Sequence, residues 1–371
     1  MTDLSQGLGP DPLLGQVLEG RYRIAERIGS GGMSAVYRAD PVDGSPPVAV
    51  KVLHDELLRD EAQKERFERE ARALFGLDHP NILQVSDFGV VNGVPFLVME
   101  QLHGMTLDKF TEDELPAPEI ALHIVEQVLE GLAYAHQQGV LHRDLKTENV
   151  FVAQAPNGGL TAKLLDFGLV KFVDDDRWGQ GKQLTSYGEV FGTPAYMSPE
   201  QCTGAHVDTG SDVYSMGVLT FELFTGTWPF VEETRVDMLR AHLMTPVPSL
   251  ASANSEVTFR PEFDAFVQRA LQKDAKDRFE NAGAMLTALR AIAKPVARRH
   301  VRQDSAANFK VIPSGPAALG SLATDSTARH AAQPPARVSS GVPPILVWSF
   351  VVLFVLLLGA AAALFAVVLL T

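Results

Sequence analysis

The sequence predicts an α+β fold with two lobes: a small lobe of antiparallel strands with one long helix, and a larger, mainly helical lobe. Short runs rich in β-branched residues, which are typical of strands, occur at residues 22–32, 33–40, 46–53, 82–89 and 95–102. Between the third and the fourth run, a charged helix is expected from about Asp55 to Phe75, ended by Gly76. After Leu115 the pattern becomes mainly helical.

Composition limits the class of protein. The chain of 371 residues is 46% hydrophobic, which is enough to bury a large core. Its single cysteine, Cys202, excludes an intrachain disulfide and indicates a reducing compartment. The net charge is −13, and the acidity lies before residue 296, because residues 296–371 carry six Lys and Arg against two Asp. An acidic body argues against nonspecific binding of nucleic acid, so we expect no nucleic-acid partner.

The chain is expected to divide into four segments. The predicted segments are an N-terminal extension at 1–20, a folded domain at 21–293, a disordered linker at 294–344 and a membrane-spanning helix at 345–370. Within the folded domain, the small lobe is expected at about 21–103 and the large lobe at about 104–293. The linker is rich in Ala, Ser and Pro, which interrupt any periodicity and favour disorder.

The segment at 345–370 carries no charge. As a helix it would extend roughly 39 Å, whereas the hydrocarbon core of a membrane is about 30 Å thick. A buried core helix is the alternative, but such helices rarely run uncharged beyond about 18 residues. The cations of the linker all precede this segment, so the positive-inside tendency places the folded domain on the cytoplasmic side. We therefore expect a single-pass protein of the cell membrane, with its C-terminus at the outer side.

A glycine-rich loop, Gly29-Ser30-Gly31-Gly32-Met33-Ser34, separates the first two expected strands. Glycines let backbone N–H groups approach phosphate oxygens closely, although a plain hairpin turn is the alternative. In the third strand, Ala49 and Lys51 share the face that can turn toward this loop. There the ammonium group could bind phosphates, whereas a lysine that faces solvent is the alternative. A glutamate of the charged helix could hold it, and Glu70 is a better candidate than Glu68 or Glu65.

The strongest signal is His142-Arg143-Asp144-Leu145-Lys146-Thr147-Glu148-Asn149. Phosphoryl transfer needs a carboxylate that accepts the proton of the attacking hydroxyl, a cation near the moving phosphoryl group and an oxygen ligand for magnesium. Asp144, Lys146 and Asn149 supply these three groups within six residues. A surface loop that has this composition by chance is the alternative.

The tripeptide Asp-Phe-Gly occurs twice, at 87–89 and at 166–168. Only the second copy follows the loop of Asp144 and a predicted hairpin at 150–165, so Asp166 would bring a second metal-binding side chain to the same place. The first copy is predicted to form a strand and a turn in the small lobe. The order along the chain therefore decides between two identical motifs.

In this order, the motifs resemble the eukaryotic-type protein kinase family, and in detail its bacterial membrane-bound serine/threonine branch. The resemblance covers about residues 20–292 and includes the segments 192–201 and 212–217. Two positions depart from the pattern: Ser34 replaces the third glycine of the loop, and Ser198 replaces the alanine of the usual Ala-Pro-Glu. Both departures exchange one small residue for another, and no ligand or base is missing.

The resemblance implies ATP and Mg²⁺ as cofactors and Ser and Thr residues of proteins as substrates. It implies that Asp144 is the catalytic base, with Lys146 and Lys51 acting beside it, and that Asn149 and Asp166 bind Mg²⁺. Lys51 would contact the α- and β-phosphates and pair with Glu70. The residues implied around the nucleotide are Ile28, Gly29, Ser30, Gly31, Gly32, Met33, Ser34, Val36, Ala49, Lys51, Glu70, Met99, Glu100, Leu102 and Phe151.

Regulation is implied by the segment at 169–197. A phosphate on Thr185, with Ser186 as the nearest competitor, would pair with Arg143 and activate the kinase, after transfer from a neighbouring copy in a possible homodimer. Thr193 matches the serine/threonine branch, and Glu200 would form a buried, structural ion pair with Arg278. Two alternatives are a pseudokinase that only binds nucleotide and a kinase of small molecules. The complete set of catalytic groups argues against the first, and the activation segment argues against the second.

Overall fold

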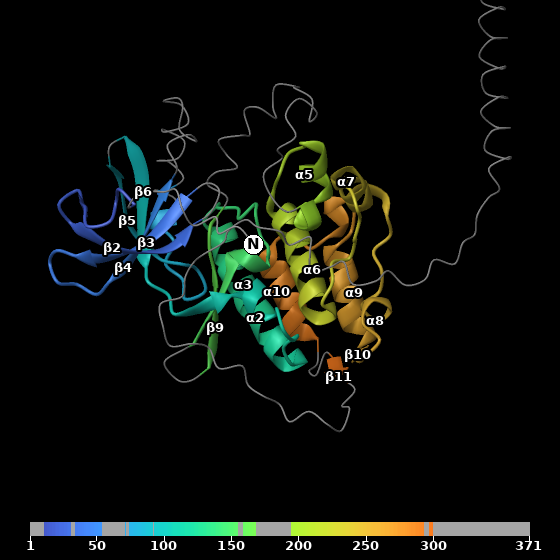
Figure 1. Ribbon diagram of the computed structural model, residues 1–371. Helices are drawn as coiled ribbons and strands as arrows, with labels where there is room; N and C mark the ends of the chain where they lie inside the picture. Colours follow the sequence, from blue (N-terminus) through green and yellow to red (C-terminus); the bar gives the residue numbers. More distant parts are fainter. Residues whose placement is uncertain are drawn as a thin grey trace, which may run out of the picture. The chain divides into compact units, whose positions relative to one another are not determined.

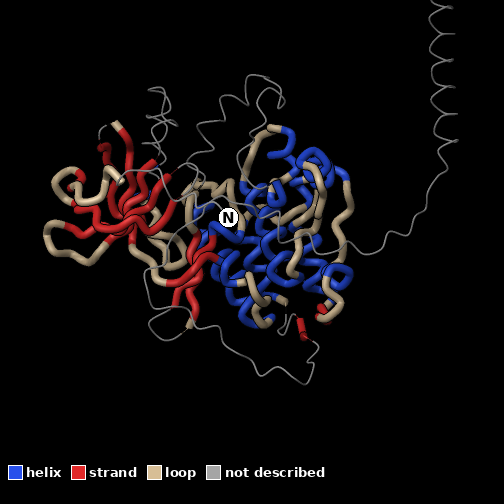
Figure 2. The backbone as a smooth tube through the Cα atoms, in the orientation of Figure 1, coloured by secondary structure: helices blue, strands red, loops and turns tan. Residues whose placement is uncertain are grey.

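The computed structural model describes residues 11–30, 34–53, 71, 74–91, 93–154, 159–167, 194–292 and 297–299. For residues 297–299, only the backbone is described. These residues form a sheet-rich small lobe and a helix-rich large lobe (Figure 1, Figure 2). The small lobe extends to residue 100, and the large lobe begins at residue 104. The predicted α+β, two-lobed fold is therefore confirmed for the described residues.

Six strands form one antiparallel sheet in the small lobe, in the order β1-β2-β3-β4-β6-β5. They are β1 (Val17–Leu18), β2 (Tyr22–Ser30), β3 (Ser34–Pro41), β4 (Val48–Leu53), β5 (Val85–Val91) and β6 (Val94–Glu100). The five predicted runs correspond to β2 to β6, but the fourth begins at Val85 and not at Ile82. Ile82 instead forms a parallel bridge with Leu164 of the large lobe.

Residues 11–20, which were predicted as an N-terminal extension, pack as part of the small lobe. Leu18 is 0% exposed and belongs to the same core cluster as Ile24. The hydroxyl of Tyr37 donates a hydrogen bond of 2.9 Å to the carboxylate of Asp11. The ordered small lobe thus begins before the first predicted strand.

Strand β4 has two different faces, as its alternating pattern predicts. Val50 packs with Phe96 in the core on one side of the sheet. Ala49 packs with Val36 on the other side. Lys51 has the same parity as Ala49, so its side chain leaves the strand on the side of Val36. The charged helix expected beside this strand lies mostly outside the described residues.

The large lobe consists of helices and a short three-stranded antiparallel sheet, β7-β8-β9, which lies at the edge of the helices on the side of the small lobe (Figure 2). The strands are β7 (Gly104–Thr106), β8 (Val150–Gln154) and β9 (Leu160–Leu164), and β8 and β9 form the predicted hairpin. The α-helices are α2 (Leu107–Phe110), α3 (Pro118–Gln137), α5 (Pro199–Thr203), α6 (Thr209–Thr225), α7 (Arg235–Met244), α8 (Leu250–Ala253), α9 (Pro261–Ala270) and α10 (Ala282–Ala291). Three-residue 3₁₀ turns are η2 (Thr147–Asn149), η3 (Pro194–Tyr196) and η4 (Ala275–Asp277).

Helix α6 is the central helix of this lobe and packs against α3 and α9 (Figure 1). The side chain of Asp208 caps its first turn, and Gly226 ends it with a φ of 77°. Almost every residue of α6 is buried, including the polar residue Asp212. A buried carboxylate is costly unless it is hydrogen-bonded, so the partners of Asp212 matter for the site.

A short strand follows the last helix. Strand β11 (Ala297–Arg299) pairs antiparallel with β10 (Val257–Phe259), although residues 297–299 lie within the range predicted as linker. Across the described ranges, no helix is both long and apolar enough to cross a bilayer. The predicted membrane-spanning helix at 345–370 lies outside those ranges.

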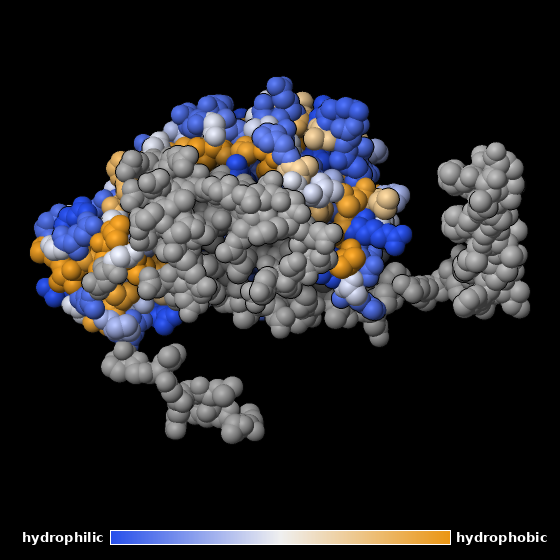
Figure 3. Space-filling model, turned by 90° about the horizontal axis from the view of Figure 1, so that it is seen from above, coloured by the Kyte–Doolittle hydropathy of each residue, from blue (hydrophilic) through white to orange (hydrophobic). Residues whose placement is uncertain are grey.

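The surface mixes hydrophilic and hydrophobic residues over both lobes (Figure 3). The exposed large hydrophobic residues of the small lobe include Leu14, Val17, Val42 and Val90, and those in and before α7 are Val231, Val236, Leu243 and Met244. Apolar residues are common on the surface of folded domains, so their exposure alone does not indicate a function.

Candidate active site

An apolar wall lies on the Lys51 side of the small-lobe sheet. Ile28, Val36, Ala49 and Met99 form one buried cluster that draws on β2, β3, β4 and β6. In the register of the sheet, Val36 is opposite Lys51 and Ala49 is opposite Met99. The Cβ atoms of cross-strand neighbours are about 5 Å apart, so the side chain of Lys51 leaves its strand beside this wall. Such a surface can hold a molecule that has an apolar ring at one end and negative charge at the other.

The ammonium group of Lys51 contacts the carboxylate of Asp166 across the two lobes. The distance from Nζ to Oδ1 is 2.5 Å, and the two side chains are 11% and 25% exposed. The alternative in which Lys51 points into solvent is therefore wrong. Asp166 has a φ of 37°, a left-handed conformation that the surrounding structure must enforce. Glu70, the predicted partner of Lys51, lies outside the described residues.

Three polar side chains meet in the loop before β8. The amide nitrogen of Asn149 donates to the backbone oxygen of Asp144 at 2.7 Å and to its Oδ2 at 3.1 Å. The Nζ atom of Lys146 lies 3.9 Å from the same Oδ2. The backbone N–H of Leu165 donates to the carbonyl of Asn149 at 2.9 Å, which places Asn149 beside Asp166. Because its nitrogen donates to Asp144, the other amide atom, Oδ1, is the one that can bind a cation.

His142 attaches this loop to the residues around Asp166. Its Nε2 atom lies 2.9 Å from the carbonyl oxygen of Leu165, and its ring packs on Phe167 with 4.7 Å between the centroids. A carbonyl oxygen can only accept, so we assign the proton to Nε2. Burial lowers the pKa of His142, so the ring is neutral and acts as a structural link.

The carboxylate of Asp212 holds the backbone of the loop. The N–H groups of His142 and Arg143 donate to its two oxygens at 2.8 and 2.7 Å, and Nε2 of His136 lies 2.9 Å from Oδ2. On the other side of the His136 ring, Nδ1 accepts a 3.3 Å hydrogen bond from the N–H of Ala282. Burial alone would raise the pKa of Asp212, but the hydrogen bonds from His136 and His142 hold that pKa below its usual value.

Arg143 is held in an unusual backbone conformation. Its φ is 62°, which is uncommon for a residue with a side chain. Its N–H donates to Asp212, and its carbonyl oxygen accepts a 2.9 Å hydrogen bond from the side chain of Gln201. Gln201 also forms a capping box with Ser198 at the start of α5. Arg143 therefore connects the loop of Asp144 to the segment that follows the predicted activation segment.

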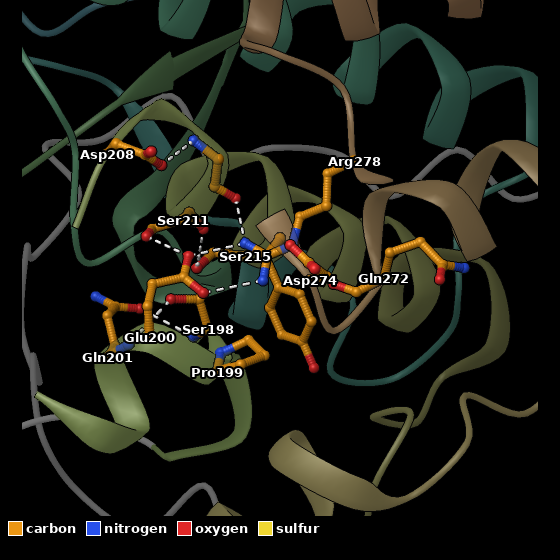
Figure 4. Close-up of polar contacts among 12 residues, drawn as sticks. Ser198, Pro199, Glu200, Gln201, Asp208, Ser211, Ser215, Gln272, Asp274 and Arg278 are labelled. Carbon is orange, nitrogen blue, oxygen red and sulfur yellow. Dashed lines mark hydrogen bonds and ion pairs between the residues drawn. The ribbon is translucent and has the colours of Figure 1, made fainter. Parts of the chain in front are cut away.

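The predicted ion pair between Glu200 and Arg278 is present (Figure 4). The two guanidinium NH groups reach Oε1 and Oε2 at 2.8 and 2.9 Å. The other donors bond to the backbone carbonyls of Gly210, Gln272 and Lys273. The side chain of Arg278 is 0% exposed, so each of its donors needs such a partner. This pair joins α5 to the residue that follows η4, and the bond to Gly210 adds the start of α6, so its role is structural.

A buried network links the loop of Asp144 to α6. The hydroxyl of Tyr196 donates to the carboxyl of Glu222 and lies 3.0 Å from the hydroxyl of Thr147. Burial raises the pKa of Glu222 to about 8, and the nearby charges of Glu148 and Asp108 act in the same direction. Glu222 is therefore mainly protonated at neutral pH.

A second apolar cluster lies next to the connection between the lobes. Leu102, Phe151 and Leu165 form it, and Leu83 contacts both this cluster and the wall on the sheet. Residues 101–103 thus run beside two apolar clusters that belong to different lobes.

Of the predicted glycine-rich loop, Gly29 and Ser30 are described: they end β2, opposite Val36 and Ala35. The predicted residues outside the described part are Gly31, Gly32, Met33, Glu70, Thr185, Ser186 and Thr193.

The family model of the protein kinase domain matches residues 22–289. The chain belongs to the protein kinase family. Three similar curated proteins are serine/threonine-protein kinases: pkn2 and pkn3 of Myxococcus xanthus and PknL of Mycobacterium tuberculosis. Their identities are 41, 39 and 38%, over 76, 80 and 80% of this chain.

The chain spans only part of these relatives: 33% of pkn2, 53% of pkn3 and 72% of PknL. Among solved structures, the crystal structure of the PknI kinase domain of Mycobacterium tuberculosis is 27% identical, with a TM-score of 0.58. This match covers 74% of this chain and 97% of that chain. The likeness agrees with the kinase fold described above.

Asp212 and His136 were not predicted as functional residues, although they position the loop of Asp144. Asp212 belongs to the segment 212–217, which was noted only as a family resemblance. One signal was available, because a carboxylate inside an apolar helix needs buried partners. The identity of those partners was not available, because they are about 70 residues away in the chain.

Replacing Glu222 with Gln should make stability depend less on pH. Its pKa in the folded protein, about 8, is above the usual 4.5, so folding retains a proton that the unfolded chain releases. The free energy of unfolding that this proton contributes is fully present below the pKa of Glu222 in the unfolded chain. It is lost as the pH rises through the pKa of Glu222 in the folded protein. Urea unfolding between about pH 5 and pH 8.5 should show a steeper loss for wild type than for Glu222→Gln.

The exposed Glu262 provides the control for this measurement, because its side chain is 59% exposed. Glu262→Gln should follow the wild-type curve across the same pH range. Parallel curves for wild type and Glu222→Gln would show that the pKa of Glu222 is not raised.

Proposed function

We propose that this chain is a serine/threonine protein kinase that transfers the γ-phosphate of ATP to hydroxyl groups of proteins. The observation that carries the proposal is the meeting of Lys51 with Asp166 at 2.5 Å, next to Asn149, which bonds to Asp144 at 3.1 Å. These side chains come from both lobes and are the groups that phosphoryl transfer requires. The names of the three relatives support the serine/threonine class.

The residues present fit a nucleotide and a magnesium ion. Asp166 offers a carboxylate and Asn149 an amide oxygen, which are the hard oxygen ligands that Mg²⁺ prefers. Within the described ranges, no three His, Cys, Asp or Glu side chains form a metal-binding group, and two protein ligands suit Mg²⁺, which keeps waters and phosphates as its other ligands. When bound, ATP would supply the phosphoryl group, and Mg²⁺ would neutralise its charge.

In the proposed reaction, Asp144 orients the acceptor hydroxyl and takes its proton. Lys146, at 3.9 Å from the Asp144 carboxylate, stabilises the charge that develops on the phosphoryl group. Lys51 would position the α- and β-phosphates, and Glu70 is its expected partner from the family resemblance. The base of the nucleotide would lie against Val36, Ala49, Met99 and Phe151, with the backbone of Glu100 and Leu102 offering hydrogen bonds and residues 28–34 covering the phosphates.

Two other functions are less well supported. A pseudokinase would not need all four of Lys51, Asp144, Asn149 and Asp166, which this chain keeps. A kinase of small molecules would not need the motif Ser198-Pro199-Glu200, which lies at the start of α5 and whose Glu200 pairs with Arg278. The first feature favours catalysis, and the second favours a protein as the acceptor.

Replacing Asp144 with Asn should lower phosphoryl transfer at least about 100-fold and leave the fold intact, because general-base catalysis contributes about 10²–10⁴-fold. Transfer of radiolabelled phosphate from ATP to a generic protein substrate measures this effect. Asp40→Asn is the matched control, since its side chain is 48% exposed on β3, and it should keep wild-type activity. Near-normal transfer by Asp144→Asn would refute the assignment of the base.

We infer further that a neighbouring copy activates the kinase by phosphorylating Thr185. Arg143 supports this inference, because its backbone is held on both sides, and it precedes the proposed base. A phosphothreonine would add about −1.5 to −2 charges that a guanidinium can pair with. Thr185→Ala should therefore lose most activity. Peptide mapping decides the matter: full activity of this variant, with Ser186 and Tyr187 unmodified, would exclude the switch.

We also propose that the uncharged segment at 345–370 anchors the kinase to the cell membrane, with the catalytic domain in the cytoplasm. Its length and lack of charge support this proposal. The full-length protein should sediment with membranes and resist extraction by carbonate. A chain that ends at Gln333 should be soluble and active. Recovery of the full-length protein in the soluble fraction would contradict the anchor.

A further inference from the structure

The side chain of Glu100 is turned toward β9 of the large lobe. Its Oε1 atom accepts a 2.7 Å hydrogen bond from the ammonium group of Lys163 and a 2.9 Å hydrogen bond from the backbone N–H of Gln84. The backbone N–H of Glu100 also donates to the carbonyl of Gln84 at 3.0 Å. The last residue of β6 is therefore fixed through both its backbone and its side chain.

Lys163 reaches a second group on the same segment. Its Nζ atom donates to the carbonyl oxygen of Ile82 at 3.4 Å. Beside this contact, the N–H of Leu83 donates to the carbonyl of Leu164, and the N–H of Leu164 donates to the carbonyl of Asn81, at 2.9 and 2.8 Å. One lysine of the large lobe thus joins the segment 81–84 and the end of β6. We refer to Lys163, the Glu100 carboxylate, the Gln84 N–H and the Ile82 carbonyl as the hinge clamp.

The hinge clamp is partly shielded from water. The side chain of Lys163 is 16% exposed and that of Glu100 is 34% exposed. Fully exposed ion pairs contribute little to stability, but shielding and a second acceptor make this pair stronger than a typical surface pair. For comparison, the pair of Lys276 and Asp274 has exposures of 77% and 51%.

The clamp borders both ends of the proposed nucleotide site. Leu102, two residues after Glu100, belongs to the apolar cluster of Phe151 and Leu165. In the other direction, Lys163 precedes Asp166 by three residues, and Leu165 between them bonds to the carbonyl of Asn149. Because Glu100 is the last residue of β6, loss of its contact with Lys163 would release the backbone of residues 100–102 beside the expected position of the base.

We propose that Lys163 is a positioning residue for the nucleotide, which acts through Glu100 by holding the backbone of residues 100–102 in place between the lobes. This inference rests on the proposed function. A preformed backbone saves the ordering that binding would otherwise require, so the clamp should affect nucleotide affinity. Lys163 touches none of the groups proposed to transfer the phosphoryl group, so kcat should change little.

The experiment uses the full-length chain and four variants: Lys163→Met, Glu100→Gln, the double variant and Lys163→Arg. Equilibrium titration with a fluorescent ATP analogue gives Kd, and steady-state assays give the KM for ATP and kcat. For Lys163→Met, we expect Kd and KM to rise roughly two- to fivefold, with kcat within about twofold of wild type. Glu100→Gln should change both values in the same direction and by no more, because its amide oxygen can still accept a hydrogen bond. The double variant should bind nucleotide no more weakly than Lys163→Met, because both substitutions act on one interaction.

Two comparisons separate positioning from a general loss of structure. Lys163→Arg should keep near-wild-type affinity, because a guanidinium can still pair with the carboxylate. Lys276→Met removes an exposed lysine from an ion pair and should leave Kd unchanged. Unchanged Kd in Lys163→Met, a fall in kcat at constant KM, or additive losses in the double variant would each overturn the inference.

The nucleotide titration also separates this inference from the proposed function. A wild-type protein that binds the ATP analogue without transferring phosphate would refute the kinase activity, and the Kd values would still decide on the clamp. A wild-type protein that binds no nucleotide would refute both.

Discussion

The buried carboxylate of Asp212 is the interaction on which the site depends. An ion inside an apolar lobe is tolerated only when its lone pairs are occupied, and here the occupants are two backbone N–H groups of the loop and the ring of His136. Helix α6 is buried almost all round, so the carboxylate cannot move unless the lobe unpacks. The loop is therefore held through its backbone, and the side chain of Asp144 is available for chemistry.

From that anchor, short contacts extend to the small lobe. The loop reaches Leu165 and Phe167 through His142, and Asp166 between them reaches Lys51 on β4. The same stretch after β9 bonds to Asn149, and β9 itself bonds to the end of β6 through Lys163. The two lobes thus share one frame of hydrogen bonds near the site. This frame explains how strained residues such as Asp166 keep their geometry.

The features that could be predicted from the sequence have a local pattern. Alternation predicted the faces of β4, and the order of the motifs separated Asp166 from its duplicate Asp87, which lies in β5 as expected. The contacts that fix Asp212 could not be predicted, because hydrogen bonds between distant residues leave no periodic trace. The contribution of residues 11–20 was missed for a similar reason: a two-residue strand is too short to show alternation.

The folded small lobe begins before the part of the chain that matches the kinase family. The family match begins at residue 22, but Leu18 lies in the core, and Asp11 bonds to Tyr37. A chain cut at the family boundary would lack a buried leucine, a loss comparable to core truncations that cost about 2–5 kcal/mol. That is a large share of the roughly 5–15 kcal/mol that stabilises a domain. Such a shortened protein could lose activity through unfolding alone, with every catalytic group still in its sequence.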